Sequence, residues 1–162
     1  MKELTSIFGL LLLLSCASQQ TSMEKSIKRL EEEAKNGKLE SAHALCYRFS
    51  NGLNAKQDDK LAFKWCNEAA KEQSPRAMTL LADLYYEGRG TNRDYRQAAK
   101  LYYFAAERGI EKAMMMLYYV YENGHGVVKD ATEAKYYLNR AASRNYKPAI
   151  ELKQQLLLKS EK

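Results

Sequence analysis

Proline and glycine are scarce in this 162-residue chain, which has two prolines and eight glycines. Their scarcity excludes a collagen-like or low-complexity chain, and together with abundant alanine, leucine, lysine and glutamate it favours helix. The length suits one domain with a sizeable core. Twelve tyrosines are an excess for which the fold must find a place.

Long apolar runs are also lacking. The segment Ile7–Leu14 is the main apolar run, and it falls well short of the roughly 20 residues that span a bilayer. A short run near the start of a chain is typical of a secretory signal peptide, which we place at residues 1–15. The sequence Leu13-Leu14-Ser15-Cys16 resembles the lipobox of bacterial lipoproteins. This resemblance implies cleavage before Cys16 and acylation of that cysteine, whereas a plain signal peptide cut after Ala17 is the alternative.

Acylation at Cys16 would make residues 16–22 a lipid-anchored linker, because several acyl chains hold a protein on a membrane essentially permanently. Ala17 is not the aspartate that commonly retains lipoproteins at the inner membrane. The expected location is therefore the outer membrane, facing the periplasm. A soluble periplasmic or secreted protein is the alternative.

Cysteine is rare too. If Cys16 carries lipid, Cys46 and Cys66 remain as an even pair in an oxidising compartment. Their separation of twenty residues suits two facing helices, so we predict a disulfide that would contribute on the order of 3 kcal/mol. Two small buried thiols are the alternative, since free cysteine also favours protein cores.

Residue patterns that carry catalysis or bind cofactors are missing. The two histidines are His43, which we expect to be solvated, and His125, which lies between two glycines. The chain has no HExxH, paired CxxC, Gly-x-Ser-x-Gly or phosphate-loop motif. We therefore predict no catalytic residue, no metal site and no cofactor. The net charge of +6 comes from interspersed basic and acidic residues, and nucleic acid is not an expected partner of an exported protein.

What the chain does contain is a repeat of 36 residues. Gly88, Gly90, Asp94 and Ala98 recur as Gly124, Gly126, Asp130 and Ala134. A weaker copy lies 36 residues upstream, with Asn54 at the place of the second glycine. Fixed self-similarity at this period indicates a helical-repeat solenoid.

Each repeat is predicted to form a helix, a turn and a second helix. Gly88 and Gly124 end the first helices, because the residue beyond a helix end often needs a positive φ. Asp94 and Asp130 are placed to cap the second helices. Gly90 and Gly126 belong to the same turns.

This pattern resembles the Sel-one-like repeat family, a branch of the tetratricopeptide-related α/α superhelices. The resemblance implies an all-α fold, a short right-handed α/α superhelix of three repeats at 41–76, 77–112 and 113–148. Residues 23–40 are expected to form an N-terminal cap helix with Ile27, Leu30 and Ala34 facing inward. Residues 149–162 are expected to form a C-terminal cap helix with Ala149 and Leu156 on its apolar face.

The resemblance also implies that the first helices line a concave face. Removing the expected core positions leaves Tyr and Met residues suited to a protein interface, together with acidic residues of a polar rim. The predicted partner-binding residues are Tyr47, Met78, Asp83, Tyr86, Met114, Met115, Tyr119 and Glu122, with Thr79 and Glu87 beside them.

These features predict a noncatalytic envelope lipoprotein that binds a protein or peptide. An immunity protein against a toxin acting in the periplasm is one version, implied by the resemblance alone, and an envelope adaptor is another. A small-molecule binder or hydrolase of the β-lactamase-like cysteine-rich repeat type is the alternative from a different class. A mainly structural or lipid-associated role is a third possibility, and it is favoured by the basic charge.

Overall fold

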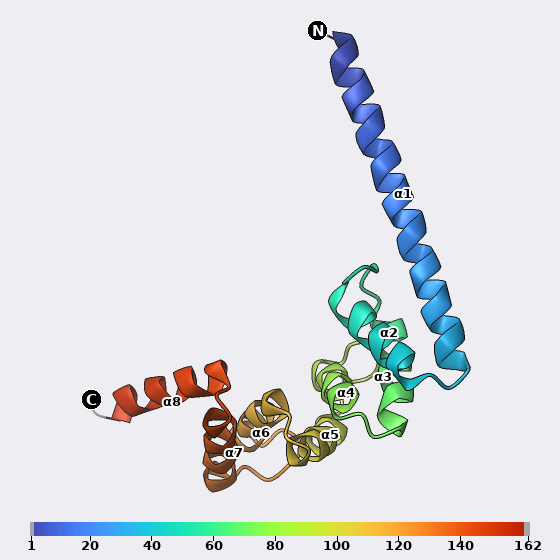
Figure 1. Cartoon of the computed structure of the whole chain (residues 1–162). Helices are drawn as coiled ribbons and strands as arrows, with labels where there is room; N and C mark the ends of the chain where they lie inside the picture. Colours follow the sequence, from blue (N-terminus) through green and yellow to red (C-terminus); the bar gives the residue numbers. More distant parts are fainter. Residues whose placement is uncertain (1, 161–162) are drawn as a thin grey trace.

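The computed structural model describes the backbone of residues 2–160 and the side chains of residues 19–159. Every regular element in this part of the chain is a helix (Figure 1). The helices are α1 Lys2–Lys35, α2 Leu39–Asn51, α3 Asp59–Lys71, α4 Pro75–Glu87, α5 Tyr95–Glu107, α6 Glu111–Asn123, α7 Ala131–Ser143 and α8 Lys147–Ser160.

Three helix pairs, α2–α3, α4–α5 and α6–α7, form the predicted repeats and pack in chain order. Figure 1 shows the first helix of each pair on the inner side of a bend and the second helix on the outer side. The repeats begin two residues earlier than predicted, at residues 39, 75 and 111. At the second repeat the reason is local, because Ser74 caps the helix and Pro75 takes its first position.

Glycine and aspartate shape the turn inside each pair as the sequence predicts. Gly88 and Gly124 end their helices in the left-handed region, at φ of 75° and 72°. The Asp94 side chain accepts hydrogen bonds from two backbone N–H groups of α5, and Asp130 does the same in α7. Both turns are therefore held by the local chemistry expected from the repeat.

The second glycine of each turn has a different role, which is close approach to the preceding repeat. A Cβ atom on Gly90 would lie 2.0 Å from the carbonyl oxygen of Asp59, and one on Gly126 would lie 2.4 Å from that of Tyr95. Asp59 and Tyr95 begin the second helix of the preceding repeat. Backbone therefore packs on backbone at these two junctions, which leaves space only for glycine.

Two buried apolar clusters run through the solenoid. Alanines such as Ala62, Ala98 and Ala105 are fully buried, which permits close approach of the helices. Tyr102 is fully buried as well, so part of the tyrosine excess belongs to the core. Cys46 in α2 and Cys66 in α3 are joined by a disulfide within the first repeat, the pairing that the sequence predicts.

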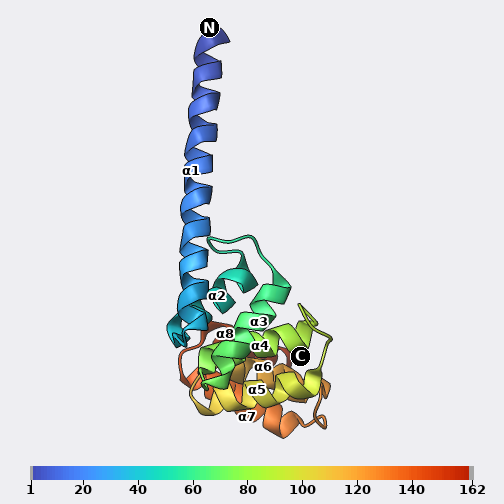
Figure 2. The same cartoon turned by 90° about the vertical axis from the view of Figure 1, so that its right-hand side faces the viewer.

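The two ends differ in part from the expected caps. One helix, α1, runs through the predicted signal peptide and linker and ends at Lys35, so the cap helix is shorter than 23–40. Ile27, Leu30 and Ala34 pack against the core as predicted. Cys16 lies outside the residues whose side chains are described. Figure 2 shows α1 extending away from the repeats.

At the other end Ala149 is buried, but Leu156 is exposed because α8 packs chiefly on α7 and no described helix follows it. Within the described part of the chain, no helix is long and apolar enough to cross a membrane.

The glycine junction gives a test with a matched control in the same turn. Gly126→Ala should lower the free energy of unfolding by several kcal/mol, because strain at positive φ adds to overpacking against Tyr95. Gly124→Ala has a similar φ but only ordinary contacts near 3.4 Å, so it should cost about 1–2 kcal/mol. Denaturant unfolding measures both. Equal costs would show that the close approach is unimportant.

Candidate functional site

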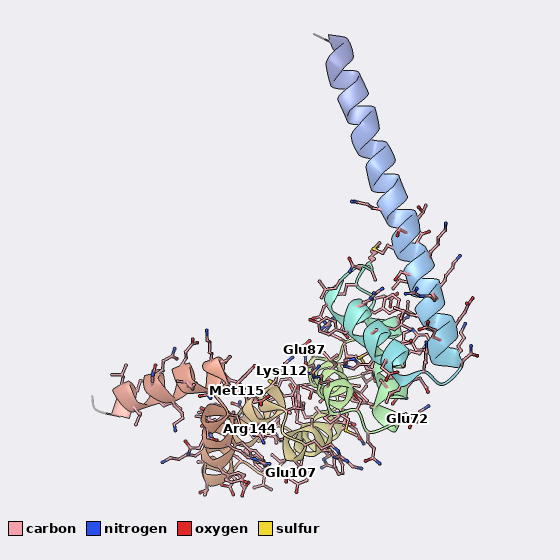
Figure 3. All side chains as sticks on the ribbon, viewed as in Figure 1. Glu72, Glu87, Glu107, Lys112, Met115 and Arg144 are labelled. Carbon is pink, nitrogen blue, oxygen red and sulfur yellow. A yellow bond between two sulfur atoms is a disulfide. The ribbon has the colours of Figure 1, made fainter. Side chains whose placement is uncertain are left out.

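An open groove of about 600 Å³ lies on the inner side of the bend, across the first helices of successive repeats. We name it the first-helix groove. In Figure 3, Glu87 and Lys112 mark this inner side, and Glu72 and Glu107 mark the outer side. Eight residues of α2, α4, α6 and the loop before α6 line the groove: His43, Tyr47, Asn51, Arg76, Thr79, Leu80, Ile110 and Lys112.

Equivalent positions of the repeat build this groove. His43 and Thr79 are 36 residues apart, as are Arg76 and Lys112, so each pair has the same place on neighbouring first helices. Leu80 and Ile110 add apolar surface. Tyr47 is 48% exposed, and its ring is the large aromatic surface on the α2 side. The groove thus combines an apolar floor, a phenol and two cationic side chains.

His43 is the most constrained polar group of the groove. Its Nε2 atom is buried and has no hydrogen-bond partner among the described residues. Burial first, and then the positive charge of Arg76, lower the pKa of His43 below its usual value of 6.5. The imidazole is therefore neutral at pH 7, and the sequence-based expectation of a solvated histidine is wrong because α4 and Arg76 come close to it.

Asp83 has a structural partner on each side, although the sequence predicts it as a partner-binding residue. The hydroxyl of Tyr102 donates to Asp83 Oδ1 at 2.7 Å, and Lys112 Nζ donates to Oδ2 at 2.6 Å. Burial first, and then the charge of Asp83, raise the pKa of Tyr102 above its usual range. Asp83 therefore links α4 to α5 and to the next repeat, and it also positions Lys112 at the groove.

The predicted surface methionines are a correction. Met78, Met114 and Met115 are 9%, 0% and 7% exposed, so the expectation that they form a binding surface is wrong. All three belong to the apolar cluster between the second and third repeats. Thr79 is buried too, and its hydroxyl donates to the Pro75 carbonyl oxygen. A solenoid stacks each first helix on its neighbour, so these side chains are covered by the adjacent repeat.

Tyr86 is also committed to packing between repeats. Its hydroxyl lies 2.7 Å from His125 Nδ1, and the His125 ring stacks on Tyr95 at a centroid distance of 4.4 Å. In the preceding junction Arg89 has the same place and bonds to Asp59 and to the Ser50 carbonyl oxygen. The residue between the two turn glycines therefore connects its turn to the preceding repeat.

Two other predicted residues do reach the surface. Tyr119 is 36% exposed on α6, with its ring 5.0 Å from that of Tyr118. Glu122 is partly buried at the end of the same helix, 4.0 Å from Lys129. Of the residues predicted for the interface, Tyr47 and the buried Thr79 line the first-helix groove, while Tyr119 lies on α6 at the position equivalent to Asp83.

Arg76, Lys112 and Asn51 were missed as groove residues. The signal was present, because Arg76 and Lys112 recur with the 36-residue period near the start of two first helices. As for metals, no group of three His, Cys, Asp or Glu side chains that could hold an ion occurs among residues 19–159.

Three stretches of the chain, 39–74, 75–110 and 112–146, match the family model of the Sel1 repeat. The chain belongs to the Sel1 repeat family. The matched boundaries follow the helix pairs of the structure. Sel1 repeats are typically protein-interaction modules, and the fold is generally a noncatalytic scaffold. No curated protein matches this chain.

Solved Sel1 repeat structures show the same fold. A Sel1 repeat protein from Oxalobacter formigenes is 33% identical, with a TM-score of 0.68 over 81% of this chain and 98% of that one. A protective antigen of uropathogenic Escherichia coli is 27% identical, with a TM-score of 0.71 over 75% of this chain. The present chain spans only 26% of that antigen. Cysteine-rich protein B of Helicobacter pylori shares the fold at 20% identity, a TM-score of 0.63 and coverage of 82% and 96%.

The burial of Met78, Met114 and Met115 can be tested directly. Met114→Ala should lower the free energy of unfolding by about 2–5 kcal/mol, because it leaves a cavity between two repeats. Tyr47→Ala should change it by about 0.5 kcal/mol or less, because the side chain is about half exposed and lies on the surface. Thermal or denaturant unfolding compares the two. A destabilising Tyr47→Ala together with a neutral Met114→Ala would reverse the assignment.

Proposed function

We propose that this Sel1 repeat protein is a noncatalytic binding module of the cell envelope, anchored by lipid at Cys16. It holds a protein or peptide segment on the inner face of its first helices. The observation that carries the proposal is the first-helix groove, where the exposed ring of Tyr47 lies beside apolar and cationic side chains. Tyrosine and arginine are enriched where proteins bind one another.

The supporting context is the family. Sel1 repeats are typically protein-interaction modules. The inner face of a solenoid is an extended concave surface that is already formed before a partner binds. Two envelope roles fit such a surface. The protein either blocks a toxin that acts in the periplasm, as an immunity protein, or connects components of the outer membrane as an adaptor.

A photocrosslinking residue at Tyr47 in the full-length protein tests the proposal in cells. The matched control is a probe at Tyr136, which is 53% exposed on the second helix α7. We expect one protein to be captured repeatedly at Tyr47 and not at Tyr136, and to be lost with Tyr119→Asp at the equivalent position of α6, the first helix of the third repeat. Mass spectrometry identifies the captured protein.

The identity of that protein separates the two roles. A secreted toxin would establish an immunity protein, and a resident envelope protein would establish an adaptor. Equal capture at Tyr47 and Tyr136 would show that the inner face is not the binding surface.

A further inference from the structure

We infer that the first-helix groove recognises a carboxylate on its partner: an aspartate, a glutamate or a chain terminus next to an apolar side chain. This inference rests on the proposed function, because it names the chemistry that the inner face selects. The partner is a peptide segment of another protein, which the charges and contacts of the groove select.

The groove is lined by positive charge. Arg76 and Lys112 line the groove, and none of its described lining residues is an aspartate or a glutamate. Arg76 is exposed, and its side chain forms no hydrogen bond or ion pair with any of residues 19–159. Its guanidinium therefore has a full set of donors for a carboxylate, which it can bind through two parallel hydrogen bonds.

The carboxylate of Asp83, on the same helix as Arg76, is paired with other residues. Its two oxygens already accept from Tyr102 and from Lys112. This pairing offsets the charge of Lys112 and leaves the charge of Arg76 at the groove. The ammonium of Lys112 is about half exposed, so its remaining N–H groups can still donate to a ligand.

His43 supplies a second donor near Arg76. Its Nε2 atom is buried without a partner. Its Nδ1 atom is not buried, and it has no hydrogen-bond partner among the described residues. The neutral tautomer with the proton on Nδ1 places the N–H group where solvent or a ligand can accept it. A carboxylate held between Arg76 and His43 would accept from both side chains.

Apolar contacts define the remainder of the ligand. Leu80 and Ile110 form apolar lining, and the exposed ring of Tyr47 borders the same space. A volume of about 600 Å³ is within the range of sites that hold small ligands, so it accommodates a few side chains of a peptide. The groove is therefore suited to an acidic residue with an apolar neighbour.

The test is a selection from a phage-displayed library of random peptides against the full chain in detergent. Selected peptides should be enriched in aspartate or glutamate next to an apolar residue. Arg76→Gln should weaken their binding by about tenfold or more, because it removes a charge-assisted contact. Replacing the peptide's glutamate with glutamine should cause a similar loss. Arg96→Gln on α5, outside the groove, is the matched control and should have no effect.

The carboxylate inference and the proposed binding groove would be contradicted by different results. Peptides that need Tyr47 but show no acidic preference would overturn the carboxylate inference and leave the groove as a binding surface. Peptides indifferent to Tyr47 and Arg76, or a selection that enriches nothing, would count against the groove itself. Synthetic versions with a free or an amidated C-terminus distinguish a chain terminus from an acidic side chain.

Nuclear magnetic resonance of the two histidines locates the bound charge. A bound glutamate peptide should raise the pKa of His43, because a nearby carboxylate favours the charged imidazole. The glutamine peptide should leave it unchanged. His125, which stacks on Tyr95 at the junction of the last two repeats, is the internal reference. An equal shift at both histidines, or no shift at His43, would contradict binding beside Arg76.

Discussion

Gly126 and Gly90 come so close to the backbone of the preceding repeat that a Cβ atom would overlap Tyr95 or Asp59. This contact sets the spacing between helix pairs, and the spacing in turn determines which side chains of each first helix are covered. The residue between the glycines, Arg89 or His125, adds polar or aromatic contacts to the same junction. The inner face and its groove follow from that stacking.

The groove arises because equivalent positions of the repeat lie side by side and carry different side chains. Neighbouring first helices place equivalent positions side by side, so His43 lies beside Thr79 and Arg76 beside Lys112. Of these four side chains Thr79 is buried, whereas His43, Arg76 and Lys112 lie outside the buried core. Buried alanines and Tyr102 pack the helices, and the disulfide joins α2 to α3. A scaffold whose stability lies largely in its junctions can vary an exposed groove residue such as Arg76, which is why Sel1 repeats suit binding roles.

Much of the fold was predictable because it depends on local chemistry. The 36-residue period, Gly88 as a helix end and Asp94 as a cap act over a few residues and leave a clear pattern in the sequence. The candidate site was harder. Met114 and Met115 have the composition of an interface, but the adjacent repeat covers them, and helical periodicity does not say which neighbour covers a face. Likewise, Arg76 is a groove residue only because α2 and α6 lie on either side of it.

The central claim is that the stacked first helices form the binding surface. Amide hydrogen exchange, measured on the protein alone and bound to the partner captured at Tyr47, tests it most directly. The account predicts slower exchange on binding in α2, α4 and the start of α6, with α3, α5 and α7 little changed. Protection confined to α3, α5 and α7 would contradict it, because the partner would then lie on the outer side of the bend.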